Sequence, residues 1–234
     1  MFVESEVDSV VMSGWGTAVT AGLLEVHEAV REVAAMPAVA CVTGAPGVGK
    51  STAVADALRA ERGERGQDAV WLTFRSRPTM AMLRDALWQR LWPGTLTPRS
   101  RTDFEHGVTR AFERTRRTVV LDRADVLPRE ALEYFAALAE DPRVDVALIA
   151  IGSPAWGAAL PQRAPNLHSF TYRRIRLEPL TDAEARTVVP GLHPIWADAT
   201  AHAITDLNHD VAGALRGWQR VTAHRLATPG ADRT

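Results

Sequence analysis

Lysine is almost absent from this sequence of 234 residues, because Lys50 is the only lysine among the 27 Lys and Arg side chains. Arginine therefore serves wherever the chain merely needs a positive charge. A lysine carries a compact ammonium on a flexible stem, whereas the guanidinium of arginine is a rigid planar fork. The lysine at position 50 therefore predicts a site where a compact ammonium is required and a planar guanidinium does not fit.

Cysteine is equally scarce, since Cys41 is the only one. A single thiol excludes a disulfide within the chain, and we expect Cys41 to fill space in a buried strand. The seven histidines show no metal-ligand spacing with one another or with Cys41, so the sequence predicts no zinc site. A reducing cytoplasm is the expected setting for such a chain.

Neither a large charge excess nor a long apolar run is present. The net charge is −1 and the isoelectric point about 6.7, so any basic surface must be local. The longest apolar run, at 146–151, is far too short to span a bilayer. The first residues are acidic, at Glu4, Glu6 and Asp8, and no basic stretch precedes an apolar one, which argues against a secretory signal. We therefore expect no membrane partner.

What the chain does contain is a glycine-rich motif around Lys50 that fits the pattern GxxxxGK[ST] of a phosphate-binding loop. Residues 39–43 before it suit a buried strand, and residues 51–58 after it read as the start of a helix. In such a loop the backbone N–H groups and the helix N-terminus face the phosphates, and the lysine reaches the β- and γ-phosphates. The residues predicted to bind ATP are Gly44, Ala45, Pro46, Gly47, Val48, Gly49, Lys50, Ser51 and Thr52. We expect Ser51 to ligate Mg²⁺ and Thr52 to hold the α-phosphate.

An apolar run at 119–121 is followed by Asp122, where a P-loop nucleotidase needs a carboxylate to hold the hydration shell of Mg²⁺. The spacing from Lys50 leaves room for one intervening strand with its helices. An aspartate at a strand end often only caps the next loop. Because it follows a phosphate-binding loop, Asp122 is predicted to be the metal aspartate.

The residue after Asp122 departs from a common pattern, because Arg123 stands where many such ATPases have a glutamate that polarises the attacking water. An arginine stays protonated at any working pH and cannot act as a base. Asp125 or Glu130 could substitute if its side chain pointed back into the site. Otherwise we expect slow hydrolysis, or a switch that binds nucleotide without turnover.

Strands alternate with helices along the chain, which predicts an α/β fold with a parallel central sheet flanked by helices. From residue 181 onward the pattern is purely helical, with breaks near Pro190 and Asn208, and predicts a small helical lid. The expected organisation is an irregular N-terminal arm at 1–16, a nucleotide-binding domain at 17–180, the lid at 181–228 and a disordered tail at 229–234.

Three predicted helices carry expectations about their faces. A helix at 17–35 and another opened by Pro78 should each bury an apolar stripe. A third, capped by Asp103 and running to about residue 117, would carry an arginine stripe that is either a solvated face or a phosphate-contacting surface. The three stripes are Ala21, Leu24, Val26, Ala29 and Val33; Met82, Leu83, Leu87 and Leu91; and Arg110, Arg114 and Arg117.

Seven tryptophans beside only two tyrosines raise the question of a stacking site. Trp15 and Trp156 lie in less regular segments, where either could stack on adenine or on a partner. Four others lie in apolar-periodic segments and are expected to fill core or interface space: Trp71, Trp88, Trp92 and Trp218.

The order of these motifs resembles the AAA+ ATPases, and within them the helper ATPases of DNA transposition of the TniB/MuB kind and their relatives in secretion and origin-recognition proteins. The resemblance covers about residues 17–228 and rests mainly on the phosphate-binding loop. Looser matches are Val-Leu-Asp-x-Ala-Asp at 120–125, Gly-Ser-Pro at 152–154, the segment 173–184, and Gly-Ala-Leu-Arg at 213–216.

The resemblance implies roles for three further side chains. Ser153 is similar to the sensor-1 residue that reports on the γ-phosphate, with an ordinary helix cap as the alternative. Arg216 is similar to the sensor-2 arginine that the lid lays over the nucleotide, with a solvent-facing charge as the alternative. Arg163 is the candidate arginine finger for a neighbouring subunit's γ-phosphate, with Arg173 and Arg174 as competitors.

A homo-oligomer with ATP or ADP at each subunit boundary is the arrangement that the resemblance implies, in which nucleotide state controls assembly and partner contact. It also implies double-stranded DNA and a transposase-like protein as partners. Two other functions stay open on the residues alone. One is a regulatory or signalling ATPase switched by ADP/ATP exchange, which Arg123 favours. The other is a small-molecule kinase, which leaves the helical lid unexplained.

Overall fold

The structure is a computed structural model, and it describes residues 16, 19–65, 69–74, 76–113 and 115–227. The predicted tail at 229–234 lies outside these residues, as do Trp15, Arg114 and all of the predicted arm except Gly16. The chain divides into two compact units. The larger contains Glu25–Gly44 and Lys50–Arg176, and the smaller contains Met1–Leu24, Ala45–Gly49 and Leu177–Thr234.

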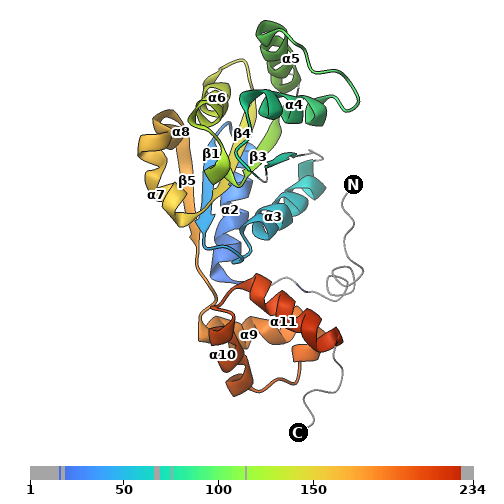
Figure 1. The fold of residues 1–234 in the computed structure, drawn as a ribbon, viewed down its shortest axis with the longest axis vertical. Helices are drawn as coiled ribbons and strands as arrows, with labels where there is room; N and C mark the ends of the chain where they lie inside the picture. The colour runs from blue at the N-terminus through green and yellow to red at the C-terminus, as the bar shows by residue number, and fades with distance from the viewer. Residues whose placement is uncertain (1–15, 17–18, 66–68, 75, 114, 228–234) are drawn as a thin grey trace. The chain divides into compact units, whose positions relative to one another are not determined.

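The larger unit is built on a five-stranded sheet in the order β2-β3-β4-β1-β5 (Figure 1). The strands are β1 (Val39–Gly44), β2 (Val70–Thr73), β3 (Arg117–Asp122), β4 (Val146–Gly152) and β5 (Thr171–Leu177). Strands β1 to β4 pair in parallel, and all of β4 is buried, as expected for a parallel sheet covered on both faces. The predicted α/β fold with a parallel central sheet is confirmed.

Helices connect the strands and supply the rest of the core (Figure 1). They are α2 (Ala21–Ala35), α3 (Lys50–Arg65), α4 (Met80–Leu91), α5 (Arg101–Glu113), the 3₁₀ turn η1 (Ala124–Val126), α6 (Arg129–Glu140), α7 (Pro154–Arg163) and α8 (Pro165–Phe170). The indoles of Trp88 and Trp92 lie 4.2 Å apart and pack against this core, which confirms their predicted role. Cys41 is buried, also as expected, and burial raises the pKa of its thiol to about 11, so it stays protonated.

Two of the predicted apolar stripes contain errors. In α2, Leu24 is 59% exposed and Ala21 is exposed, while Leu23 is buried. In α4, Met82 is 53% exposed, while Leu83, Leu87 and Leu91 form the buried face. Successive residues on a helix point about 100° apart, so a residue adjacent in sequence to a buried stripe turns away from the core.

The predicted arginine stripe is also wrong. Ser100, not Asp103, caps α5, because its hydroxyl accepts a hydrogen bond from the Asp103 amide at 3.3 Å. The helix ends at Glu113, and Arg117 is the first residue of β3. Helical periodicity had placed Arg117 in the last turn of this helix, but Arg117 belongs to a strand that pairs with β4.

The smaller unit holds the helices α9 (Asp182–Leu192), α10 (Ala201–Asp210) and α11 (Leu215–Ala227), with a 3₁₀ turn η2 (Pro194–Trp196). Thr181 and Glu184 form a reciprocal capping box at the start of α9. The helix breaks fall near the predicted positions, because Pro190 and Asn208 lie in the last turns of α9 and α10. The rings of Trp196 and Trp218 meet edge to face in the core, 5.3 Å apart.

Asn208 connects the ends of these helices. Its side chain is 3% exposed, and its amide nitrogen donates to the Leu180 carbonyl and to Asp182 Oδ1, both at 3.0 Å. Its amide oxygen accepts the indole N–H of Trp218 at 3.3 Å. A buried amide with three partners fixes its surroundings strongly, because losing any of them would leave a buried polar group unpaired.

Among the residues that the structure describes, no helix combines the length and the apolar character needed to cross a membrane.

Candidate nucleotide-binding site

The phosphate-binding loop has the backbone that its sequence predicts. Gly47 and Gly49 have φ values of 86° and 95°, in the left-handed region that favours glycine. Space is also restricted within the smaller unit, where a Cβ at Gly47 would lie 3.2 Å from Arg216 Cβ and one at Gly49 would lie 2.9 Å from Leu215 Cδ1. The glycines therefore permit both the tight turn and the close approach of α11.

Lys50 is the first residue of α3, directly after this loop, and β1 ends at Gly44 just before it. The Lys50 ammonium donates a hydrogen bond to the Gly44 carbonyl at 2.8 Å. This bond holds the single lysine of the chain over the backbone at the start of the loop. The helix that begins here adds the partial positive charge of its N-terminus to that of the ammonium.

Asp122 lies at the end of β3 and is held by two hydroxyl groups. Ser51 Oγ donates to Asp122 Oδ1 at 2.9 Å, and Thr73 Oγ1 donates to Asp122 Oδ2 at 3.4 Å. The indole N–H of Trp71 donates to Thr73 Oγ1 at 3.0 Å. The predicted metal residues Ser51 and Asp122 are thus brought together from positions 71 residues apart in the sequence.

This oxygen pair suits Mg²⁺, which is usually bound by one or two carboxylates or hydroxyls, with phosphate oxygens and water completing its shell. Among the residues that the structure describes, no cluster of three His, Cys, Asp or Glu side chains could hold a metal by itself. Ser51 and Asp122 are the two oxygen donors that could hold such a cation together with the phosphates of a bound nucleotide.

Sequence reasoning missed Thr73 and misjudged Trp71, which is half-buried and serves as a donor to Thr73. The parallel register pairs Thr73 with Asp122, so both side chains reach the same edge of the sheet. Thr73 is the polar residue that directly follows the apolar run 69–72, and that position was the available signal.

Arg123 follows Asp122 with an unusual backbone, since its φ of 60° and ψ of 46° are left-handed. Its side chain is exposed and makes no capping bond to η1. Asp125 lies within η1, three residues after the metal aspartate. The alternative base Glu130 instead lines another cavity.

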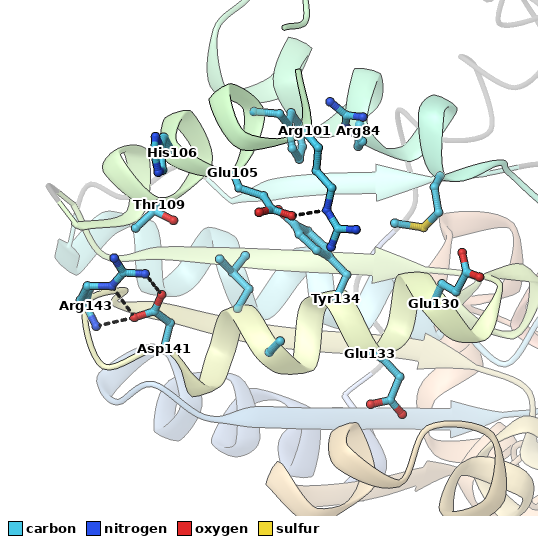
Figure 2. Close-up of a pocket in the computed structure, with 14 residues that line it drawn as sticks. Arg84, Arg101, Glu105, His106, Thr109, Glu130, Glu133, Tyr134, Asp141 and Arg143 are labelled. Atoms are coloured by element: carbon cyan, nitrogen blue, oxygen red, sulfur yellow. Dashed lines mark hydrogen bonds and ion pairs between the residues drawn. The ribbon is translucent and has the colours of Figure 1, made fainter. Parts of the chain in front are cut away.

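That cavity lies between α5 and α6 and has a volume of about 880 Å³. Figure 2 shows the Arg101–Glu105 pair beside Tyr134 near its middle and the Asp141–Arg143 pair at one end. Burial raises the pKa of Tyr134 well above its usual value. The residues that line this cavity include none of the phosphate-binding loop.

Ser153 is the N-cap of α7, and its hydroxyl accepts the Trp156 amide at 3.2 Å. It follows β4 directly, and the registers pair Ile151 with Asp122 and Gly152 with Thr43. Ser153 therefore leaves the sheet at the edge where β1 and β3 also end. Trp156 is only 2% exposed and packs against Gly152, so the suggestion that it stacks on adenine or a partner is wrong.

The three candidate finger arginines all have partners within the chain. Arg163 donates to the carbonyls of Asp125 and Leu127, at 3.4 and 3.2 Å. Arg173 forms ion pairs with Glu32 at 3.0 Å and Glu28 at 3.6 Å. Arg174 donates to the His168 carbonyl at 2.7 Å.

Arg216 approaches the phosphate-binding loop through its backbone. Its amide donates to the Gly47 carbonyl at 3.0 Å, while its side chain is exposed. The turn before α11 supports this placement, because Gly213 has a φ of 65° and its carbonyl accepts the Leu180 amide at 2.9 Å. A Cβ at Gly213 would lie 2.5 Å from the Leu180 carbonyl oxygen, so only glycine fits there.

Comparison with known proteins identifies a family that this chain matches. Residues 36–158 match the AAA domain family. No curated protein matches the chain in sequence. Many solved structures share the fold, and their sequence identity is low enough that the likeness concerns the fold alone.

Among them, Cdc6p from Pyrobaculum aerophilum has a TM-score of 0.66 at 17% identity, over 88% of this chain and 59% of that one. The ADP form of the ORC2 protein from Aeropyrum pernix has a TM-score of 0.65 at 12% identity, over 87% and 61%. The ORC1 protein from Aeropyrum pernix, in complex with DNA, has a TM-score of 0.55 at 18% identity, over 90% and 66%. The chain thus spans about three fifths of the length of the first two.

The family match covers more than half of the chain and includes the phosphate-binding loop, β3 with Asp122, and Ser153. The strand order and the paired Ser51 and Asp122 agree with it. The chain therefore belongs to the AAA domain family, as a P-loop ATPase of the AAA+ type that resembles the origin-recognition ATPases in fold.

Proposed function

We propose that the chain binds ATP with Mg²⁺ at the edge of the sheet where β1 and β3 end, and that its nucleotide state controls self-assembly and partner contact. The observation that supports this best is the Ser51–Asp122 hydrogen bond of 2.9 Å next to Lys50. It brings a hydroxyl and a carboxylate to the place where a phosphate-bound cation would lie. Gly44 to Thr52 cradle the phosphates, Lys50 contacts the β- and γ-phosphates, and Thr52 holds the α-phosphate.

When bound, Mg²⁺ neutralises phosphate charge and orients the terminal phosphate for attack by water. Asp122 would hold the hydration shell of the cation, and Ser51 would be a direct ligand. Ser153 senses the γ-phosphate and Arg216 lies over the nucleotide. Asp125 is the nearest carboxylate in sequence that could take the proton of the attacking water, because Arg123 cannot.

Asp122→Asn is expected to preserve ATP binding within a few-fold but to lower hydrolysis by about a hundredfold. The amide keeps an oxygen that can accept the Ser51 hydroxyl, whereas it loses the negative charge that holds Mg²⁺. ATP titrations with Mg²⁺ and with EDTA, together with phosphate release, measure both effects. Wild-type turnover by the folded variant would show that Asp122 has no part in the metal site.

ATP with Mg²⁺ is expected to drive self-association, while the nucleotide-free protein stays smaller. In AAA+ proteins the nucleotide lies at a subunit boundary, and a boundary that includes its phosphates is more stable when they are present. Light scattering at tens of micromolar protein, without nucleotide and with ADP or ATP, measures the size. A strictly monomeric protein in every state would favour a single-subunit switch or a kinase.

Double-stranded DNA and a transposase-like protein are the partners that we propose for the assembled form. One of the structural neighbours, the ORC1 protein from Aeropyrum pernix, was solved in complex with DNA. The net charge of −1 requires any DNA contact to be local and sensitive to salt. An ATPase assay with and without double-stranded DNA, run beside a screen of small-molecule phosphate acceptors, tests the proposal. Phosphate transfer to an acceptor would replace it with a kinase.

A second candidate is a nucleotide-switched regulatory ATPase with little turnover. Arg123 supports it, because a cation follows the metal aspartate and the backbone there is left-handed. In that case ATP and ADP bind with different consequences for assembly, although hydrolysis is negligible over the lifetime of the complex. Equal assembly with ADP and ATP would exclude this second candidate.

A further inference from the structure

The side chain of Arg163 is placed to organise the segment that follows the metal aspartate. One guanidinium nitrogen, Nη1, donates to the Asp125 carbonyl at 3.4 Å, and the other, Nη2, donates to the Leu127 carbonyl at 3.2 Å. Both acceptors belong to the short segment 123–127, immediately after β3. A planar fork that binds two backbone oxygens restricts that segment more tightly than a single bond could.

The helix that carries Arg163 is well fixed at both ends. α7 begins at Pro154 after the Ser153 cap, and Arg163 is its last residue. Ala164 is fully buried, its amide donates to the Leu160 carbonyl at 2.9 Å, and Pro165 starts α8 at once. The backbone at Arg163 has little freedom, because the buried Ala164 and the proline at 165 fix the turn between α7 and α8.

The segment 123–127 buries the side chains of Ala124 and Leu127 in the core, whereas its backbone has little regular structure. Its only regular structure is the single 3₁₀ turn η1, with Val126 N–H donating to the Arg123 carbonyl at 3.0 Å. It also contains a non-glycine residue, Arg123, in the left-handed region, a conformation that side chains other than glycine adopt only at a cost. A conformation of this kind persists when neighbouring structure holds it, and Arg163 supplies two of the bonds that do so.

We propose that Arg163 is a positioning residue that acts within its own subunit, by clamping segment 123–127 so that Asp125 and the end of β3 keep one arrangement. This replaces the expectation that Arg163 is a finger for the neighbouring subunit, since its guanidinium is already engaged by carbonyls of its own chain. The part of the inference that concerns hydrolysis rests on the proposed ATPase function. The clamp itself does not.

The first test needs no nucleotide. Amide hydrogen exchange of the full chain is compared between wild type, Arg163→Ala, Arg163→Lys and the control Arg129→Ala, which removes an exposed arginine from the start of α6. We expect Arg163→Ala to speed exchange about tenfold at residues 124–127 but not in β4, with partial recovery in Arg163→Lys. Wild-type exchange in that segment would overturn the clamp.

The second test separates action within a subunit from action between subunits. Arg163→Ala is expected to lower the single-turnover rate at saturating ATP while its ATP affinity changes little. Mixing it with Lys50→Ala subunits, which lack their own site but keep Arg163, is expected to restore nothing. Recovery of activity in the mixture would overturn the proposal and make Arg163 a finger acting on its neighbour.

Failure of the proposed ATPase function and failure of the Arg163 clamp give different results. If wild type neither binds nor hydrolyses ATP, the proposed function fails, while the exchange comparison still decides whether Arg163 clamps the segment. If wild type hydrolyses ATP and segment 123–127 of the Arg163→Ala variant exchanges its amides at the wild-type rate, the proposed function stands and the clamp fails. A uniform rise in exchange over the whole larger unit would also overturn the clamp, because it would show general destabilisation.

Discussion

Replacing Lys50 with alanine is expected to weaken ATP binding by about a hundredfold or more, because charge-assisted hydrogen bonds contribute about 1.5–3 kcal/mol each and the ammonium serves two phosphates. The fold should survive, since the Lys50 side chain binds the Gly44 carbonyl rather than the core. ATP titration by calorimetry gives the affinity, and circular dichroism checks the fold.

Two matched variants sharpen this experiment. Arg59→Ala removes an exposed cation from the same helix, where Arg59 pairs with Asp56 at 3.2 Å, and should leave ATP affinity unchanged. Lys50→Arg keeps the charge but changes its shape, and should fail almost as severely as alanine. Unchanged affinity and turnover in a folded Lys50→Ala protein would end the interpretation of this motif as a phosphate-binding loop.

Replacing Arg123 with glutamate is expected to raise the single-turnover rate of ATP hydrolysis by roughly a hundredfold, because a positioned general base is worth that much or more. The substitution puts a carboxylate directly after Asp122, where related ATPases orient the attacking water. The left-handed backbone at position 123 is no harder for glutamate than for arginine, and the exposed side chain leaves no hole. Single-turnover rates at saturating ATP measure the effect.

Arg123→Gln is the control, since it removes the positive charge without adding a base. Light scattering in parallel shows whether assembly has changed. If glutamine accelerates hydrolysis as much as glutamate does, relief of the charge and not base catalysis explains the gain. If wild type is already fast, Arg123→Glu is slower and Asp125→Asn is inactive, then Asp125 is the base and Arg123 is no defect.

The sheet and the loop were predictable because their signals are local. An apolar run followed by glycines and Lys50 determines a strand, a turn and a helix start within about 20 residues. Asp122 was found in the same way, as a polar residue at the end of an apolar run. Nothing beyond the neighbouring residues was needed for either, and the parallel order of β1 to β4 then follows from the alternation of strands and helices.

The supporting residues could not be predicted because they depend on register and packing between distant segments. Thr73 reaches Asp122 only through the pairing of β2 with β3, and Arg163 reaches Leu127 across 36 residues. Local rules also misjudged competing choices, as when Ser100 rather than Asp103 capped α5. Trp156 looked available because its segment lacks periodicity, yet its ring fills the space that Gly152 leaves beside it.

The buried amide of Asn208 has a mechanical consequence for the smaller unit. Through Leu180, Asp182 and Trp218 it joins the segment before α9, the start of α9 and the first turn of α11 to α10. The Arg216 amide, which binds the Gly47 carbonyl, lies in the same first turn of α11 as Trp218, so any strain at that carbonyl would fall on a turn already tied to α9 and α10 through Asn208.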